Sequence, residues 1–154
     1  MTFSISRRRA LAVGTGGLAA TALGFSAPSA VAETNGFEEL IKQFTGGRAP
    51  VPGHVNLDLP KIADDGASVP ITITVDAPMT EQSYVKDILV VAEANPKPRV
   101  AVFHFSPGSG VAEVSTRIRL AQTENVVAIA KTNDGTVYMA RKEVTVTVGG
   151  CGTS

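Results

Sequence analysis

Val69-Pro70-Ile71-Thr72-Ile73-Thr74-Val75 is the stretch that decides the fold, because β-branched apolar side chains occupy every second position. A period of two places these side chains on one face of an extended strand. Pro70 has no N–H to donate to a neighbouring strand, so we expect this strand to lie near the edge of its sheet. The stretch therefore predicts a half-buried strand in a sheet protein.

Similar short stretches, separated by turn residues, fill the chain around this strand. They are residues 55–59, 88–91, 100–105, 112–120, 125–130 and 137–148. Residues 100–105 have apolar side chains on both faces, so we expect them to form a central strand. Short strands about ten residues apart, with no helices between them, predict an all-β, immunoglobulin-like antiparallel β-sandwich. A small closed barrel is the alternative, since the Cys…Trp…Cys signature of immunoglobulin domains is missing.

A short N-terminal helix should precede the strands. Its apolar residues recur at helical spacing on one face and are Phe37, Leu40, Ile41 and Phe44. Asn35 is placed to cap this helix, with Glu38 at the third helical position. Gly46-Gly47 should end it, because glycine adopts left-handed dihedrals without a Cβ clash.

The first 32 residues have the layout of an export signal. Arg7-Arg8-Arg9 precedes a weakly apolar run, and Ala30-Val31-Ala32 provides a small-residue cleavage site. Paired arginines and several glycines favour the twin-arginine route, and a general secretion signal is the alternative. We therefore expect residues 1–32 to be cleaved, and residues 33–148 to form a periplasmic sandwich domain with its helix.

Charge and hydropathy argue against nucleic-acid binding and against a membrane-spanning segment. The chain has 14 basic and 14 acidic residues, and 11 basic residues remain without the three arginines of the leader. A mildly acidic domain is unsuited to nucleic acid, which requires clustered Lys and Arg. No strongly apolar run is long enough for a membrane span.

The C-terminus holds the residue with the clearest chemistry. After the last predicted strand the chain reads Gly149-Gly150-Cys151-Gly152-Thr153-Ser154, and Cys151 is its only cysteine. Glycine has little conformational preference, so residues 149–154 predict a flexible arm that presents an exposed thiol. A lone cysteine in an exported protein stays free, pairs between chains or carries a group. A terminus without a role and a purely structural intermolecular disulfide are the alternatives.

Several segments together resemble the SoxY family, the sulfur carriers of the bacterial thiosulfate-oxidising system. They are the tail 149–152, Asn95-Pro96, and residues 100–105, 115–121, 126–130 and 134–135, and the resemblance covers nearly all of the chain after the leader. The family tail typically ends Gly-Gly-Cys-Gly-Gly, whereas Thr153-Ser154 replace the final glycine here. This departure concerns how the arm docks and leaves the thiol chemistry intact.

The resemblance implies a substrate carrier and not an enzyme. Thiosulfonate and persulfide species would stay on Cys151 while partner enzymes act on them. The implied partners are a SoxZ-like β-sandwich subunit in a heterodimer, a c-type haem cytochrome, a metal-dependent hydrolase that releases sulfate, and a sulfur dehydrogenase. The chain itself would need no cofactor.

Other polar residues provide weaker signals. Arg117 and Arg119 share the polar face of one predicted strand and are candidates for the partner interface. His54 and His104 are too isolated to predict a metal site, and we expect His104 to find a hydrogen bond on its strand. A non-enzymatic binding module, whose cysteine forms only an intermolecular disulfide, is the alternative function.

Overall fold

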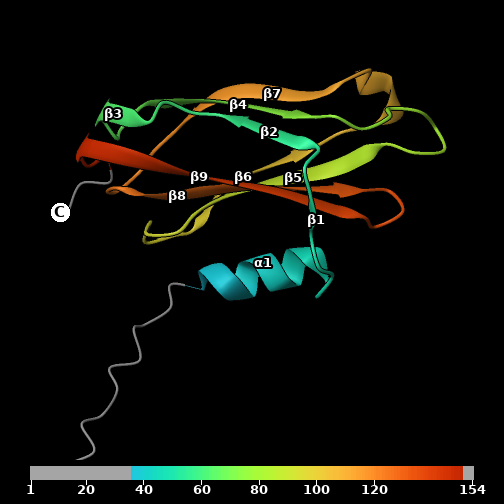
Figure 1. Ribbon diagram of the computed structural model, residues 1–154, viewed down its shortest axis with the longest axis horizontal. Coiled ribbons are helices and arrows are strands. Elements are labelled where there is room, and N and C mark those ends of the chain that lie inside the picture. The colour runs from blue at the N-terminus through green and yellow to red at the C-terminus, as the bar shows by residue number, and fades with distance from the viewer. Residues whose placement is uncertain (1–35, 151–154) are drawn as a thin grey trace, which may run out of the picture. The chain divides into compact units, whose positions relative to one another are not determined.

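A computed structural model describes residues 36–150 of the chain (Figure 1). In chain order, the elements are α1 (Phe37–Thr45), β1 (Val51–Pro52), β2 (Val55–Asp58), β3 (Ile62–Asp65), β4 (Val69–Val75), β5 (Val85–Ala92), β6 (Arg99–His104), the 3-10 helix η1 (Pro107–Ser109), β7 (Ala112–Ile118), β8 (Glu124–Thr132) and β9 (Val137–Val148). The predicted signal segment, residues 1–32, and Cys151 lie outside the described residues.

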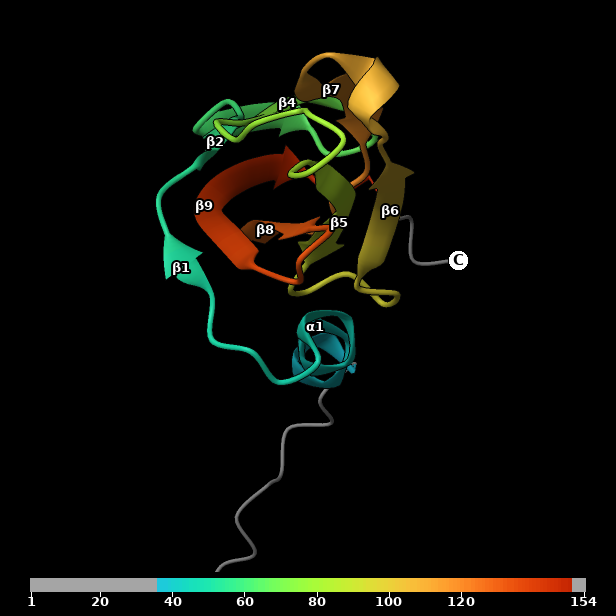
Figure 2. The same cartoon turned by 90° about the vertical axis from the view of Figure 1, so that its right-hand side faces the viewer.

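The strands form two stacked sheets, which Figure 2 shows nearly end on. The larger sheet has the order β1-β9-β8-β5-β6, with β3 also paired to β9, and the smaller has the order β2-β4-β7. Apolar side chains from both inner faces form the core, including Ile71 and Ile73 of β4, Ile88 of β5 and Val126 of β8. The predicted β-sandwich is confirmed.

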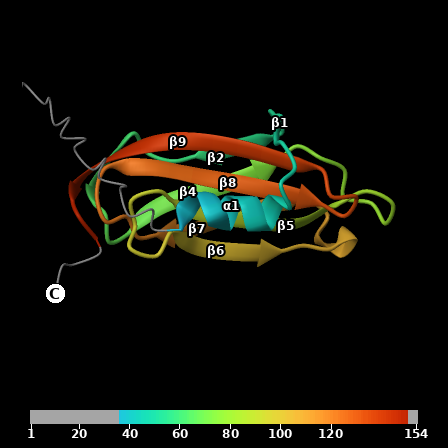
Figure 3. The ribbon, with the colours of Figure 1, turned by 90° about the horizontal axis from the view of Figure 1, so that it is seen from below.

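Strands β5 and β8 are buried on both faces. Ile88 and Val90 face the core between the sheets, whereas Leu89 and Val91 belong to a second apolar cluster under α1. Figure 3 shows α1 lying across the outer face of the larger sheet. The helix thus explains why these strands have continuous apolar runs, because a strand covered on both faces shows no alternation.

The helix itself agrees with its prediction except at its start. Phe37 is buried against the second cluster, and Leu40, Ile41 and Phe44 pack partly buried beside it. Gly46 ends the helix with φ 64°, and its N–H donates to the Lys42 carbonyl. The N-cap is Gly36 with φ 80° and no side-chain cap, so the prediction of Asn35 as the cap is wrong. Glu38 and Glu39 in the first turn still favour the helix dipole.

The structure corrects two predicted strand positions. β4, expected near an edge, is the central strand of the smaller sheet. β2 ends at Asp58, which pairs with Thr72, so Pro70 lies beyond the end of β2 and the missing donor is tolerated. β6, expected to be central, is an edge strand of the larger sheet. Its second apolar face is explained by Val102, which lines a hollow with Leu40 and Phe44 of α1.

β9 is the longest strand and carries partners along both edges. It pairs with β8 in an antiparallel register from Val144 to Val137. On its other edge it pairs in parallel with two short strands, β1 near Tyr138 and β3 near its C-terminal end. The sandwich is thus antiparallel apart from these two short pairings. β3 places the Asp65-Gly66 turn beside Val148, where the chain leaves the sheet.

Candidate functional site

Three segments meet through main-chain hydrogen bonds where β9 ends. The Gly66 N–H donates to the Val148 carbonyl at 2.7 Å, and the Leu120 N–H donates to the Gly66 carbonyl at 2.8 Å. The Gly150 N–H then donates to the Leu120 carbonyl at 2.8 Å. We call these three hydrogen bonds between Gly66, Leu120, Val148 and Gly150 the clasp. It holds the chain against the sandwich for two residues beyond the last strand.

The glycines of this region are required by space. A Cβ on Gly66 would lie 2.3 Å from the Leu120 carbonyl oxygen and 2.7 Å from the Gly150 nitrogen. A Cβ on Gly149 would lie 2.2 Å from the Ala121 carbonyl oxygen, and one on Gly150 would lie 2.0 Å from the Gly66 carbonyl carbon. None of the three has a positive φ, so close approach of main chains explains each of them.

This geometry changes the interpretation of the tail. The sequence predicts a flexible arm from Gly149 onward, whereas the described chain is hydrogen-bonded and closely packed through Gly150. Gly149 and Gly150 therefore form an anchored base for the arm. Cys151 and Gly152 lie outside the described residues, and the role of Cys151 stays a prediction.

A buried polar network supports the bend that receives the arm base. The Glu124 carboxylate accepts the Ala94 N–H at 2.7 Å, the Asn95 N–H at 3.1 Å and the Ala121 N–H at 3.1 Å. The Asn95 side chain donates to the Arg119 carbonyl at 2.9 Å and accepts the Ala121 N–H at 2.8 Å. Asn95 and Glu124 thus fix residues 119–121 on both sides of the Leu120 carbonyl.

Burial raises the pKa of the Glu124 carboxyl above its ordinary value. The backbone N–H groups around it favour the charged form and act in the opposite direction, but loss of hydration outweighs them. Burying the charged carboxylate therefore costs hydration free energy, and its hydrogen bonds to backbone N–H groups offset part of that cost. Sequence analysis missed Asn95 and Glu124 as functional residues, because their partners are main-chain groups of distant segments.

The two predicted interface arginines were expected on one strand, but only Arg117 lies on β7, which ends at Ile118, and Arg119 follows the strand end on the way to the clasp. Both are exposed. The Arg117 Nη1 donates to the Ser68 carbonyl at 3.3 Å and to the Ser68 hydroxyl at 3.2 Å. Arg119 comes directly before Leu120, whose main chain forms two of the clasp bonds. The pair thus lies close to the arm base, and its contact with a partner stays a prediction.

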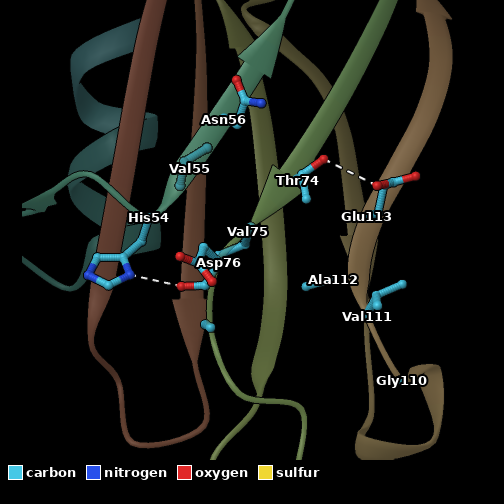
Figure 4. Close-up of a pocket in the computed structure, with 11 residues that line it drawn as sticks. His54, Val55, Asn56, Thr74, Val75, Asp76, Gly110, Val111, Ala112 and Glu113 are labelled. Atoms are coloured by element: carbon cyan, nitrogen blue, oxygen red, sulfur yellow. Dashed lines mark hydrogen bonds between the residues drawn. The ribbon is translucent and has the colours of Figure 1, made fainter.

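A separate hollow opens at the other end of the smaller sheet (Figure 4). It has a volume of about 590 Å³ and is lined by residues around the start of β2, the end of β4 and the start of β7. The His54 Nδ1–H donates to the Asp76 carbonyl at 2.8 Å, with His54 at φ 64°. The length of β4 separates this hollow from the clasp by about 20 Å at roughly 3.3 Å per residue.

Comparison with known families connects these observations. The sequence matches the family model described as "Sulfur oxidation protein SoxY" over residues 41–151. The chain belongs to the SoxY family. The match ends at Cys151, directly after the anchored base. No curated protein matches the chain significantly.

Solved structures support the SoxY fold. The chain is 33% identical to the sulfur carrier protein SoxY from Chlorobium limicola f thiosulfatophilum, covering 72% of this chain and 96% of that one with a TM-score of 0.59. A superoxide reductase (neelaredoxin) from Ignicoccus hospitalis is 18% identical, covering 61% and 80% with a TM-score of 0.55. A putative superoxide reductase from Thermotoga maritima is 18% identical, covering 67% and 89% with a TM-score of 0.51. The two reductases share only the fold.

The histidines of this SoxY-family chain have structural partners. The His104 Nδ1–H donates to the Asp87 carboxylate at 2.6 Å, which confirms the predicted hydrogen bond of His104. The His54 ring lies against the Tyr138 ring with centroids 4.6 Å apart. Within residues 36–150 no group of three or more His, Cys, Asp or Glu is arranged to hold a metal. In the same part of the chain, no helix is long and apolar enough to cross a membrane.

Proposed function

We propose that this SoxY-family chain is a covalent carrier of sulfur intermediates in thiosulfate oxidation, with Cys151 as the attachment point. One observation supports this most directly. The family match runs to residue 151, which is the only cysteine in the chain and follows the anchored base immediately. Cys151 is joined directly to Gly150 by a peptide bond, and the chain has no second cysteine with which its thiol could form an internal disulfide.

The chemistry assigns each step to a different protein. Joining the Cys151 thiolate to the outer sulfur of thiosulfate forms an S–S bond and releases two electrons. The chain has no haem-attachment or other redox motif, so a c-type cytochrome would accept those electrons. Water would then cleave the S–S bond to the sulfone, releasing sulfate and one proton and leaving a persulfide on Cys151. A metal-dependent hydrolase would catalyse that step, and a sulfur dehydrogenase would oxidise the persulfide further.

The setting proposed for this cycle is the periplasm. The twin-arginine layout of residues 1–32 supports export. The proposed permanent partner is a SoxZ-like β-sandwich subunit, and the exposed Arg117 and Arg119 are candidates for a protein interface. A carrier that keeps each intermediate attached gains from the high local concentration of its cargo at every enzyme that it visits.

The test is intact-mass analysis of the mature chain with its partner subunit, after incubation with thiosulfate and the oxidising cytochrome. The wild-type chain should gain the masses of thiosulfonate and persulfide groups, and Cys151→Ala should gain neither. Ser154→Ala, which leaves the thiol in place, is the matched control and should load normally. A wild-type chain that stays an unmodified thiol, or is recovered only as a disulfide-linked dimer, contradicts the proposal.

A further inference from the structure

The point at which the arm leaves the sandwich depends on a residue far from Cys151 in sequence. Gly66 follows β3 and is bonded to both other segments of the clasp, with its N–H on Val148 and its carbonyl on Leu120. A Cβ here would stand 2.3 Å from the Leu120 oxygen and 2.7 Å from the Gly150 nitrogen. Those two atoms form the hydrogen bond that holds Gly150, so any side chain at residue 66 would enter the space of that bond.

The two atoms nearest to a Cβ on Gly66 belong to the backbone, which cannot rotate away as the end of a side chain can. The Leu120 carbonyl is fixed on both sides, because the neighbouring Arg119 carbonyl and Ala121 N–H are hydrogen-bonded to Asn95. The residue with freedom to move is Gly150, since it lies beyond the end of β9. A methyl group at residue 66 would therefore push its own turn away from the fixed Leu120 carbonyl and from the Val146 side chain, whose Cγ1 would lie 2.9 Å from the Cβ, and would displace Gly150, so that the clasp opens.

We infer that Gly66 is a positioning residue for Cys151, which sets the start of the carrier arm at Gly150. The inference rests on the proposed carrier function and adds the element of the fold that controls it. With the clasp formed, Cys151 is one residue from the last anchored residue. With the clasp open, the last anchored residue is Val148, and the reach of the thiol grows from about 3.5 Å to about 10 Å at 3.3–3.6 Å per residue.

A longer tether dilutes the thiol at any one place. Threefold greater reach spreads Cys151 over a volume larger by an order of magnitude, and effective concentration falls steeply with tether length. It also alters the angle at which the arm leaves the surface beside Arg117 and Arg119. A partner enzyme that receives the arm while contacting the sandwich should therefore load the cysteine poorly, although the thiol itself is unchanged.

The experiment compares Gly66→Ala with Gly108→Ala in the mature chain with its partner subunit. Gly108 has an ordinary φ, and a Cβ there would meet its nearest neighbour, the Ser106 hydroxyl, at 3.6 Å. Amide hydrogen exchange at Gly150 reports the clasp, alkylation of Cys151 by iodoacetamide reports thiol reactivity, and cytochrome-dependent loading with thiosulfate reports positioning. If Gly66 served only stability, thiol alkylation and thiosulfate loading would change together.

In Gly66→Ala we expect exchange at Gly150 to accelerate at least tenfold, alkylation to stay within twofold of wild type, and the KM for partner-catalysed loading to rise about tenfold. Gly108→Ala should match wild type in all three. Should Gly66→Ala fail to fold, Gly150→Ala gives the same test, because its Cβ would lie 2.0 Å from the Gly66 carbonyl carbon and residue 150 can leave without unfolding β9.

Three results would overturn the inference. They are an unprotected Gly150 amide in the wild-type chain, unchanged amide exchange at residue 150 in Gly66→Ala and in Gly150→Ala, and normal loading when the clasp is open. Failure of the carrier function looks different, because the wild-type chain and Gly108→Ala would then carry no sulfur adduct at all.

Discussion

The two ends of the smaller sheet differ in how they are built. At the end where β9 finishes, main chains from three segments approach so closely that Gly66, Gly149 and Gly150 have no room for a Cβ. At the other end, a hollow of about 590 Å³ opens beside His54 and Gly110, and a Cβ on Gly110 would meet no atom within 4 Å. Glycine serves close packing at the first end and a positive φ of 73° at the second.

The contrast shows what a carrier requires from its fold. An enzyme needs a concave site that encloses its substrate, whereas a carrier delivers its cargo to the sites of other proteins. Its fold has to fix the base of the arm firmly. We therefore expect the packed end to matter more for the proposed function than the hollow end, and the following experiments test that ranking.

The largest effect on stability should come from Glu124→Ala. The change leaves the Ala94 and Asn95 N–H groups without their acceptor, and each unsatisfied buried donor costs about 1–3 kcal/mol. We expect a loss of about 3 kcal/mol in urea unfolding. Glu113→Ala, at the exposed carboxylate beside the hollow, should cost less than about 0.5 kcal/mol. Equal losses at the two ends would contradict the comparison.

Gly149→Ala should have a smaller effect, because the clash can be relieved locally. Its Cβ would lie 2.2 Å from the Ala121 carbonyl oxygen, and the short segment after β9 can move away. The main loss is the hydrogen bond from Gly150 to Leu120, which contributes about 0.5–1.5 kcal/mol. Thermal or urea unfolding against Gly108→Ala measures this difference. A loss above about 3 kcal/mol would show that β9 itself is displaced.

The stability contributed by Glu124 should depend on pH. Its folded pKa is raised above the ordinary value of 4.5 by burial. Its favourable contribution is therefore complete below the unfolded pKa and is lost as pH rises through the folded pKa. The free energy of unfolding of wild type relative to Glu124→Gln, measured in urea, should be greatest near pH 4 and decline toward neutrality. A difference that grows with rising pH would mean that the N–H donors outweigh burial.

The smallest effect should follow a change in the hollow. His54→Gly relieves a positive φ, which costs roughly 1–2 kcal/mol for a side chain with a Cβ. It also removes the hydrogen bond to Asp76 and the contact with Tyr138. These contributions oppose each other, so the stability should change by less than about 1 kcal/mol. Loading of Cys151 measured by intact mass should stay within twofold, and a loss as complete as that of Cys151→Ala would make the hollow part of the site.

Local patterns in the sequence were sufficient for the helix and the longer strands, but they did not predict the short strands β1 and β3. The period of residues 69–75, the apolar run 125–130 and the Gly46-Gly47 stop each correspond to an observed strand, buried strand or helix end. The lone cysteine among glycines, together with the resemblance to the SoxY family, predicts the carrier chemistry from residue identity and position, and the role of Cys151 stays a prediction. These features depend on neighbours along the chain, and the sequence contains all of those neighbours.

Only the tertiary structure decided how the elements are arranged and why the arm base is built from glycine. The order of strands places β4 in the centre and β6 at an edge, and periodicity carries no information about lateral neighbours. The sequence predicts Gly149-Gly150 as flexible, whereas the structure shows three segments of the chain whose backbones approach closely at Gly66, Gly149 and Gly150. Steric exclusion between segments distant in sequence depends on where folding brings them together, and no local pattern encodes that.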